Sequence, residues 1–396
     1  MTAYRFIEPL DVLYLRGNHL FGEDSALGRV VMPPWPTVFA GALRSRMLVD
    51  AGTEPSAYAE GRMPSEPYAT VLGTPARPGT FALGAVLLAR RNGDRLERFY
   101  PLPADVQLFE LSKASEAQGG QWEKGQDGTL EIHRLQPARL DAALVCSGAT
   151  AKLPVLCRAE AGKPASGYLL TEEGWRRYLV GDALAPAHFV KRNELWTLEE
   201  RLGIALEIAE RRTKKSALYT TETVALRPGV GFLVGVSGVD DALLPADGLL
   251  RLGGDGRAAA VSAAPQPTAL EPDWARIRQT GAFRIVLLSP GLFPGGWRLP
   301  GLDADGRWRC QGATARLVCA AVGRAEVISG WDVATKRPKP AQRFVPTGAV
   351  YWLEEFEGDI AALRKLAKDG LWGLNDDNHD PQRRAEGFNR FAVANA

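Results

Sequence analysis

The sequence predicts an α+β protein built from two related units with antiparallel sheets. Its 396 residues exceed what one hydrophobic core usually serves, so two domains are expected. Short strand-like segments occur throughout the chain, and helical patterns are few. Phe283–Leu288 and the following Ser289–Phe293 weakly repeat the first strand, Pro9 and the loop that ends in Leu20-Phe21. We expect the units at residues 1–265 and 270–396, with the Ala- and Pro-rich Ala264–Pro272 as linker.

The composition excludes several classes of protein. The 48 Lys and Arg residues nearly balance the 46 Asp and Glu residues, and a net charge of +2 excludes a wholly basic, histone-like binder. A hydrophobic fraction of 45% excludes a wholly disordered chain. The longest apolar stretches, such as Gly84–Ala89, are too short to span a bilayer, and Met1–Leu15 carries charges that a signal peptide lacks. We expect a cytoplasmic protein with no membrane contact.

Cysteine and histidine are both scarce. The 4 cysteines fit neither a disulfide framework nor the paired spacing of a zinc site. The 4 histidines leave little for histidine-based catalysis. The composition therefore favours binding over catalysis.

The N-terminal unit begins with a strand and a helix. Tyr4–Leu15 has the pattern of a strand that enters a loop, and Pro9 predicts a bend or an edge position because proline cannot donate to a ladder. Thr37 is a plausible N-cap for a helix that extends through Val49. The exposed side of this helix would present Arg44, Ser45 and Arg46.

Further strands are expected in both units. Phe81–Arg91 and Arg95–Tyr100 form a predicted hairpin that turns at Asn92-Gly93-Asp94. Ser112–Gly128 is polar and predicts a surface loop, and a helix is expected at Ile360–Lys368. The other expected strands are Leu202–Glu207, Ala217–Leu226, Gly231–Val236, Phe283–Leu288, Leu317–Val322, Ala325–Ser329 and Ala349–Phe356, with a tail at Phe388–Val393.

Two acidic segments are similar to metal-binding loops but lack essential ligands. Gly253-Gly254-Asp255-Gly256 is similar to the acidic turn of polymerase palm domains, yet Gly256 stands where the second carboxylate is needed. A glycine turn is the better explanation, and its amides together with Arg257 could contact a phosphate. Asp376–Asp380 begins like a calcium loop, but Pro381 replaces the required glycine and Gly387 the required glutamate. We expect no metal and no cofactor.

Three basic clusters interrupt the near-neutral chain. The first comprises Lys336, Arg337, Lys339 and Arg343, and Pro338 and Pro340 keep it extended. It follows Trp331, which offers a stacking face. Extended backbone, cations and an aromatic ring hold single-stranded nucleic acid, although a solvated charged loop is the simpler explanation for any one cluster. The other clusters are Arg211, Arg212, Lys214 and Lys215 before Tyr219, and the pair Arg44 and Arg46. Compensating acidic surfaces are expected, such as Glu354, Glu355 and Glu357.

Taken in order along the chain, these segments resemble one family. The matching islands are Ile7–Gly17, Pro33-Pro34, Val38–Ser45, Arg201–Ile204, Leu218–Thr220, Leu252–Arg257, Ser289–Phe293, Gly296-Trp297, Ser329–Asp332, Lys339-Pro340, Pro346–Tyr351 and Gly387–Asn389. They are similar to the third subunit of Cmr (type III-B CRISPR) effector complexes, a repeat-associated mysterious protein (RAMP) of the kind that caps the guide's 5′ end. Each island alone is weakly specific, but their joint order covers nearly the whole chain.

The resemblance implies a fold, a function and a set of residues. The fold would be two ferredoxin-like (RRM-like) modules with long loop insertions. The protein would be a non-catalytic, antiviral RNA-binding subunit that holds the repeat-derived 5′ handle of the CRISPR RNA. Its protein partners would be the large polymerase-like Cmr subunit and the adjacent backbone RAMP subunit. The residues expected to contact RNA, from motif positions and basic clusters together, are Arg16, Gly17, Gly41, Arg44, Ser45, Arg46, Tyr219, Gly253, Gly254, Arg257, Gly330, Trp331, Lys336, Arg337, Lys339, Arg343 and Gly348.

One departure and two alternatives accompany this interpretation. Asn389 stands where the family's C-terminal loop usually has glycine, so handle contacts are not carried over to that loop. A CRISPR RNA-processing endoribonuclease of the same superfamily would need a His, Tyr or Lys near the scissile phosphate, and His19 is the only histidine in a motif region. A protein-interaction module without RNA contact is the third class.

Overall fold

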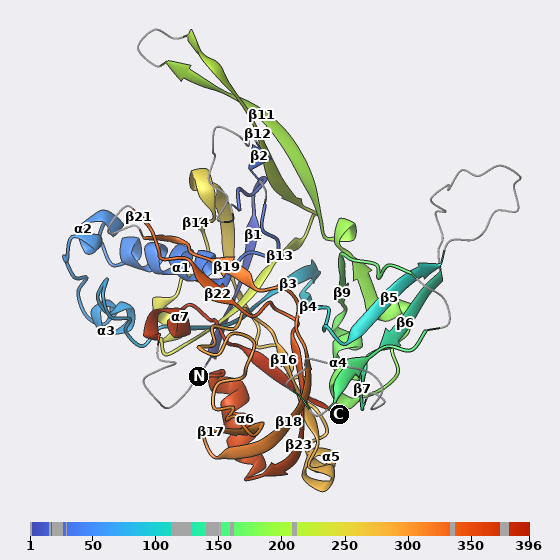
Figure 1. Ribbon diagram of the computed structural model, residues 1–396. Coiled ribbons are helices and arrows are strands. Elements are labelled where there is room, and N and C mark those ends of the chain that lie inside the picture. Colours follow the sequence, from blue (N-terminus) through green and yellow to red (C-terminus); the bar gives the residue numbers. More distant parts are fainter. Residues whose placement is uncertain are drawn as a thin grey trace, which may run out of the picture.

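The computed structural model confirms an α+β protein with mainly antiparallel sheets (Figure 1). It describes residues 2–15, 17, 27–28, 30–111, 129–139, 150, 152–158, 162–207, 212–332, 337–372 and 380–396. Some expectations fall outside these residues, namely the loop Ser112–Gly128, most of Asp376–Asp380, and Arg16, His19, Arg211 and Lys336.

The larger sheet has 8 strands in the order β10-β9-β4-β3-β13-β1-β15-β14. They are β1 (Thr2–Pro9), β3 (Ala82–Asn92), β4 (Arg95–Pro101), β9 (Tyr168–Leu170), β10 (Phe189–Lys191), β13 (Val230–Ser237), β14 (Leu249–Arg251) and β15 (Ala258–Ala264). The expected β3–β4 hairpin is confirmed, with Asn92 paired to Arg95 across the turn. Of the two alternatives expected from Pro9, the edge position is wrong, because β1 lies between β13 and β15, and the bend is confirmed directly after it, at Leu10 and Asp11. Pro9 is tolerated there as the last residue of its strand.

Helix α1 (Pro36–Asp50) packs on one face of this sheet. Its Phe39 ring is fully buried, 4.8 Å from the ring of Phe232 on β13. The helix begins at Pro36 rather than after an N-cap at Thr37, because the amide that proline lacks would be unpaired in the first turn. The expected exposed side is also wrong: Arg44 lies over the Phe81 ring and Arg46 reaches β14, so both are half-buried.

A long insertion separates β4 from β13. Its helix α4 (Glu172–Val180) was not expected from the sequence, although Thr171 caps it by accepting from the Gly174 amide at 3.1 Å. The hairpin of β11 (Trp196–Glu207) and β12 (Arg212–Leu226) confirms two predicted strands and extends away from the rest of the protein at the top of Figure 1. The other strands here are β5 (Val106–Leu111), β6 (Thr129–Arg134), β7 (Gln136–Ala138) and β8 (Leu153–Val155), while β2 (Leu27–Gly28) pairs in parallel with β12. Short helical segments are α2 (Pro55–Ala59), α3 (Tyr68–Leu72), Pro186–His188, Arg192–Glu194, Asp241–Leu243 and Gly254–Gly256.

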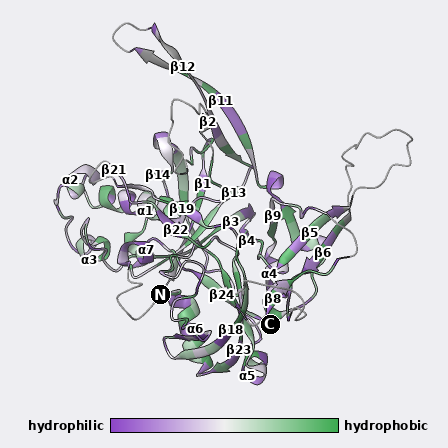
Figure 2. Ribbon diagram, viewed as in Figure 1, coloured by the Kyte–Doolittle hydropathy of each residue, from purple (hydrophilic) through white to green (hydrophobic). Residues whose placement is uncertain are grey.

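The second sheet has 5 strands in the order β17-β18-β23-β16-β24. They are β16 (Phe283–Leu287), β17 (Arg307–Cys310), β18 (Ala313–Ala321), β23 (Val350–Glu357) and β24 (Phe391–Asn395), with helices α5 (Trp274–Thr280) and α6 (Ile360–Asp369) on one side. In Figure 2 the strands of this sheet carry both hydrophobic and hydrophilic colours, since β23 ends in residues such as Glu354, Glu355 and Glu357. The basic segment expected as an extended loop contributes instead to two short ribbons, β19 (Glu326–Ile328) with β22 (Gln342–Phe344) and β20 (Trp331–Asp332) with β21 (Arg337–Pro338).

The second sheet is buried on both faces. One face packs against α5 and α6, and the other contacts the insertion through a core that includes Trp175, Tyr178 and Trp352. Within this core the Trp175 ring stacks on Tyr100 at 4.8 Å. The insertion therefore contacts both sheets and connects them.

Candidate nucleic-acid interface

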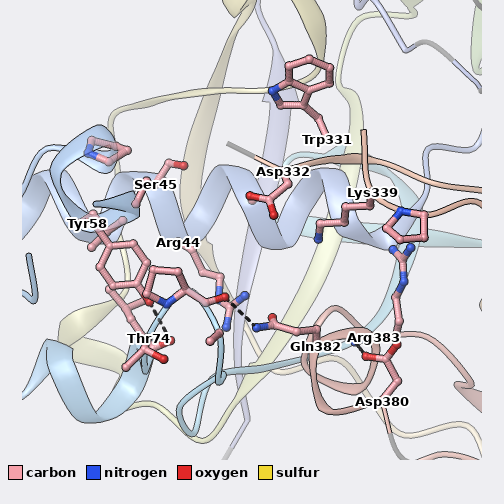
Figure 3. Close-up of a pocket in the computed structure, with 18 of the residues that line it drawn as sticks. Arg44, Ser45, Tyr58, Thr74, Trp331, Asp332, Lys339, Asp380, Gln382 and Arg383 are labelled. Atoms are coloured by element: carbon pink, nitrogen blue, oxygen red, sulfur yellow. Dashed lines mark hydrogen bonds between the residues drawn. The ribbon is translucent and has the colours of Figure 1, made fainter. Parts of the chain in front are cut away.

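A cavity of about 440 Å³ lies where α1 meets the C-terminal ribbons. It is bounded by α1, the loop after α3, the β20–β21 ribbon and helix α7 (Pro381–Ala385). The predicted residues that line it are Gly41, Arg44, Ser45, Trp331 and Lys339. Figure 3 shows Arg44, Ser45 and Tyr58 on one side and Trp331, Asp332 and Lys339 on the other. Residues almost 300 positions apart in the sequence thus meet around one hollow.

On the α1 side, the polar groups are partly withdrawn from water. Burial lowers the pKa of Arg44, while the charges of Glu386 and Tyr58 act in the opposite direction. The guanidinium lies 5.5 Å from the centre of the Phe81 ring. The Tyr58 hydroxyl donates to the carbonyl oxygen of Gly73 at 2.9 Å, and burial raises its pKa.

The opposite side is held by a short ladder and a buried carboxylate. The Lys339 amide donates to the Gly330 carbonyl oxygen at 2.9 Å, which places Trp331 on the ribbon with 60% of its surface exposed. The Lys339 ammonium lies 2.7 Å from Oε1 of Glu386, which is only 3% exposed. Lys339 is therefore an ion-paired lysine and not the solvated cation of the simpler explanation weighed against RNA contact.

Arg383 is the cavity residue that sequence reasoning missed. It is 4% exposed, donates to the carbonyl oxygen of Ser329 at 2.9 Å and lies 3.1 Å from Oε2 of Glu386. A helix start was readable here, since Asp380 followed by Pro381 is a typical N-cap and first-turn pair. From the sequence, Asp376–Asp380 is expected only as a loop that lacks calcium ligands, so the helix that carries Arg383 is not predicted.

A second, smaller group of predicted residues lies at the base of the β11–β12 hairpin. A recess of about 70 Å³ is lined there by Tyr14, Arg201, Gly203, Tyr219 and Asp255, among others. A Cβ atom at Gly203 would lie 2.4 Å from Cζ of Tyr219, so the absence of a side chain at Gly203 lets the tyrosine ring lie across β11.

The glycine turn beside this recess is explained by contacts within the chain. The Gly254 amide donates to the Tyr14 carbonyl oxygen at 2.8 Å, and a Cβ atom at Gly253 would lie 2.7 Å from the same oxygen. Arg257 lies over the Tyr14 ring and donates to Asp11 at 2.9 Å. The Gly254 amide is therefore already occupied, which weakens the phosphate contact predicted from the glycines.

Other predicted residues are dispersed. Arg46 pairs with Asp50 at 2.7 Å and donates to Leu249, while Gly348 lies against Leu102 at the contact between the two sheets' loops. Gly17 lies beside Val31. Arg337 and Arg343 are exposed on the ribbons.

The predicted acidic surface on β23 is largely neutralised within the chain. Glu354 lies 3.0 Å from Lys152, Glu355 lies 3.2 Å from Arg316, and Glu357 lies 2.7 Å from Arg307. In the part of the chain that the structure describes, no group of three or more His, Cys, Asp or Glu residues could hold a metal ion. Within the same residues, no helix is long and apolar enough to cross a membrane.

Two solved structures share this fold. One is the cryo-EM structure of the Type III-B Cmr-beta bound to cognate target RNA and AMPPnP, with 13% identity, a TM-score of 0.50 and coverage of 99% of both chains. The other is the Type III-B Cmr-beta bound to cognate target RNA, with 14% identity, a TM-score of 0.51 and coverage of 98% of this chain and 96% of that chain. No curated protein matches the chain in sequence.

The fold is thus that of a chain in the two structures of the Type III-B Cmr-beta bound to cognate target RNA. A family model for the CRISPR-associated protein (Cas_Cmr3) matches residues 5–395. The chain belongs to this family, which confirms the resemblance to Cmr proteins drawn from the ordered motifs.

Proposed function

We propose that the protein is a non-catalytic RNA-binding subunit of a type III-B CRISPR (Cmr) complex that holds the repeat-derived 5′ handle of the CRISPR RNA. The observation that carries this proposal is the cavity, where motif residues of α1 and of the β20–β21 ribbon meet. Sequence motifs that share one hollow are more simply explained by a common ligand than by separate packing roles. The proposed protein partners are the large polymerase-like subunit and the adjacent backbone RAMP subunit.

The strand orders support two ferredoxin-like modules at 1–265 and 270–396. In chain order, the central strands of the first sheet are β1, β3, β13 and β15, and they are arranged fourth, first, third, second. The strands β16, β18, β23 and β24 of the second sheet have the same arrangement. This order is that of the ferredoxin-like fold, with α1 following the first strand of one module and α6 preceding the last strand of the other.

An unpaired handle suits the chemistry of the cavity. Single-stranded RNA is recognised when splayed bases stack on aromatic rings and bond through their edges, while cations and backbone amides fix the phosphates. Trp331 supplies an exposed ring, and Ser45 and Arg44 supply donors close to it. Binding would weaken with salt to the extent that phosphates are contacted.

The test is site-specific crosslinking in the assembled complex. Guides that carry a single 4-thiouridine at each handle or spacer position are incorporated, and crosslinks to this subunit are mapped. We expect handle positions to crosslink near Trp331, and Trp331→Ala to lower guide retention about tenfold, as for loss of one stacked base. Trp297→Ala is the matched control, since Trp297 is 38% exposed and does not line the cavity. Crosslinks from spacer positions alone would contradict the proposal.

The non-catalytic part of the proposal has its own test. Purified protein is incubated with repeat RNA in the presence and absence of divalent metal. We expect no cleavage under either condition and no effect of His19→Ala. Metal-independent cutting that His19→Ala abolishes would establish the endoribonuclease alternative instead.

A further inference from the structure

Helix α1 presents bare backbone to the cavity at Gly41. A glycine in the middle of a helix destabilises it relative to alanine, so it usually has a packing or functional reason. No packing reason exists among the described residues, because a Cβ atom at Gly41 would meet nothing within 4 Å outside its own helix and its chain neighbours. Among the described residues, the helix is therefore uncovered at this point, and its backbone is open to a ligand.

The bare position and Trp331 line the same cavity. A Cβ atom at Gly330 would lie 3.9 Å from Cγ2 of Thr37, so the chain just before Trp331 runs beside the first turn of α1. Gly41 is one helical turn further along the same face, and Ser45 is one more turn along it. A flat group held in this cavity would thus have Gly41, Ser45 and Trp331 among its neighbours.

Among the lining residues that the structure describes, the charges of the cavity cancel. Arg44, Lys339 and Arg383 carry positive charge, and Asp332 and Asp380 carry negative charge within the lining. Glu386 does not line the cavity, but its carboxylate forms ion pairs with both Lys339 and Arg383. Its negative charge therefore balances the third positive charge of the lining. A phosphate site needs a surplus of positive charge or free amides, and the described lining of this hollow has polar groups without such a surplus.

We propose that the cavity binds one unpaired nucleobase, seated on the bare backbone at Gly41 and stacked by Trp331, and that Glu386 prevents Lys339 from serving as a phosphate contact. The volume of about 440 Å³ is in the usual range for small-molecule pockets. The inference rests on the proposed function, since the handle supplies the base. A free nucleoside could supply the same base, and the experiments below distinguish a base of the handle from a base of a free nucleoside.

The first experiment removes bases one at a time. Complexes are assembled with guides that carry an abasic nucleotide at a single handle position, which keeps the phosphate and deletes the base. We expect one position at which base removal lowers guide affinity at least tenfold with no change in the salt slope. At that position, Trp331→Ala and the abasic guide should not be additive, and Gly41→Ala should bind the intact guide at least fivefold more weakly without lowering the thermal midpoint.

The second experiment tests the role of Glu386 by salt titration. Glu386→Gln frees Lys339, so the slope of log affinity against log salt should steepen by about 0.7, the value for one additional phosphate contact to a single strand. Lys339→Met should weaken guide binding but leave the slope unchanged. A slope that falls by about 0.7 in Lys339→Met would show a phosphate contact and overturn the inference.

The outcomes distinguish this inference from the proposed function. If no handle position affects binding, the proposed function fails. If handle positions matter but none is coupled to Gly41 or Trp331, only the nucleobase cavity is overturned. If free adenosine, cytidine, guanosine or uridine competes at the cavity while every abasic guide binds normally, the base comes from a free nucleoside, and its assignment to the handle is overturned.

Discussion

Arg284 on β16 and Asp105 in the segment after β4 form an ion pair of 2.5 Å that is almost wholly withdrawn from water. Arg284 is 3% exposed and Asp105 is 1% exposed. The Tyr178 hydroxyl on α4 donates to the same carboxylate at 2.8 Å, and burial raises the pKa of Tyr178 far above its ordinary value. Three segments from different parts of the chain therefore share one buried charge network.

We expect Asp105→Ala to destabilise the protein by about 3–5 kcal/mol, because it leaves the Arg284 charge buried without its partner. The double substitution Asp105→Leu with Arg284→Met should recover much of this loss, since neither charge then needs to be desolvated. Urea unfolding of both variants measures the difference. Glu173→Ala, which removes an exposed pair with Arg176, is the control and should have little effect. An equal loss of unfolding free energy in the single and double variants would show that the cost does not come from leaving the Arg284 charge unpaired.

The pair between Glu172 and Arg98 predicts a pH dependence of stability. Burial alone would raise the pKa of Glu172, but the Arg98 guanidinium, at 2.9 Å, outweighs it and holds the pKa below its ordinary value of 4.5. Because the pKa of Glu172 is lowered in the folded state, the stability that this pair contributes is fully present above pH 4.5. That contribution is lost as the pH falls below 4.5.

We therefore expect Glu172→Gln to cost about 1 kcal/mol at pH 7 and progressively less below pH 4.5, because the wild-type carboxylate becomes protonated there. Urea unfolding at several pH values follows the difference between the two proteins. A difference that is constant from pH 7 to pH 3 would assign the effect to packing and not to the charge.

These networks mark the limit of what the sequence could predict. Alternation and turn residues are local signals, which is why the β3–β4 hairpin, the strands β11 and β12 and helix α6 were found. Motif order located Gly41, Trp331 and Lys339, because each is recognisable among its chain neighbours. The pairing of Lys339 with Glu386 depends on a contact across 47 positions, and no local pattern encodes it.

Asn389 shows the same limit at a single residue. From the sequence, Asn389 is expected only as a departure from the family's usual glycine, whereas the structure gives its side chain a definite role. Asn389 has φ of 59° and is fully buried, with Oδ1 accepting from the Leu292 amide at 2.6 Å and Nδ2 donating to the Leu371 carbonyl oxygen at 2.9 Å. The side chain thus ties two loops together in a conformation that asparagine tolerates.

We expect Asn389→Gly to lower the free energy of unfolding by about 1–3 kcal/mol, because the Leu292 and Leu371 backbone groups lose their partner. Asn389→Ala should be worse by about a further 1 kcal/mol, since alanine adds strain at positive φ. Thermal unfolding measures both. Guide affinity of the folded fraction should stay unchanged, and a parallel loss of affinity would instead place this loop in the RNA site.

The contact between Gly203 and Tyr219 predicts a paired effect at the hairpin base. If the Tyr219 ring stacks on a base, Tyr219→Ala should cost about 1–3 kcal/mol of guide affinity, whereas Tyr219→Phe should cost little. Gly203→Ala should reproduce much of the Tyr219→Ala loss, because its Cβ atom displaces the ring. Electrophoretic or fluorescence titration of the assembled complex measures the affinities. A normal affinity in Gly203→Ala would show that the ring's position is unimportant for RNA.

The exposed cations of the ribbons should behave differently from Lys339. Arg337 and Arg343 are exposed on β21 and β22, whereas Lys339 is paired with a buried carboxylate. Replacing either arginine by glutamine should reduce the salt slope of guide binding by about 0.7 if it contacts one phosphate of a single strand. Arg251→Gln on the edge strand β14 is the matched control, exposed but far from the basic segment in sequence. Unchanged slopes in Arg337→Gln and Arg343→Gln would remove the basic ribbon from the RNA path and leave the cavity as the main point of contact.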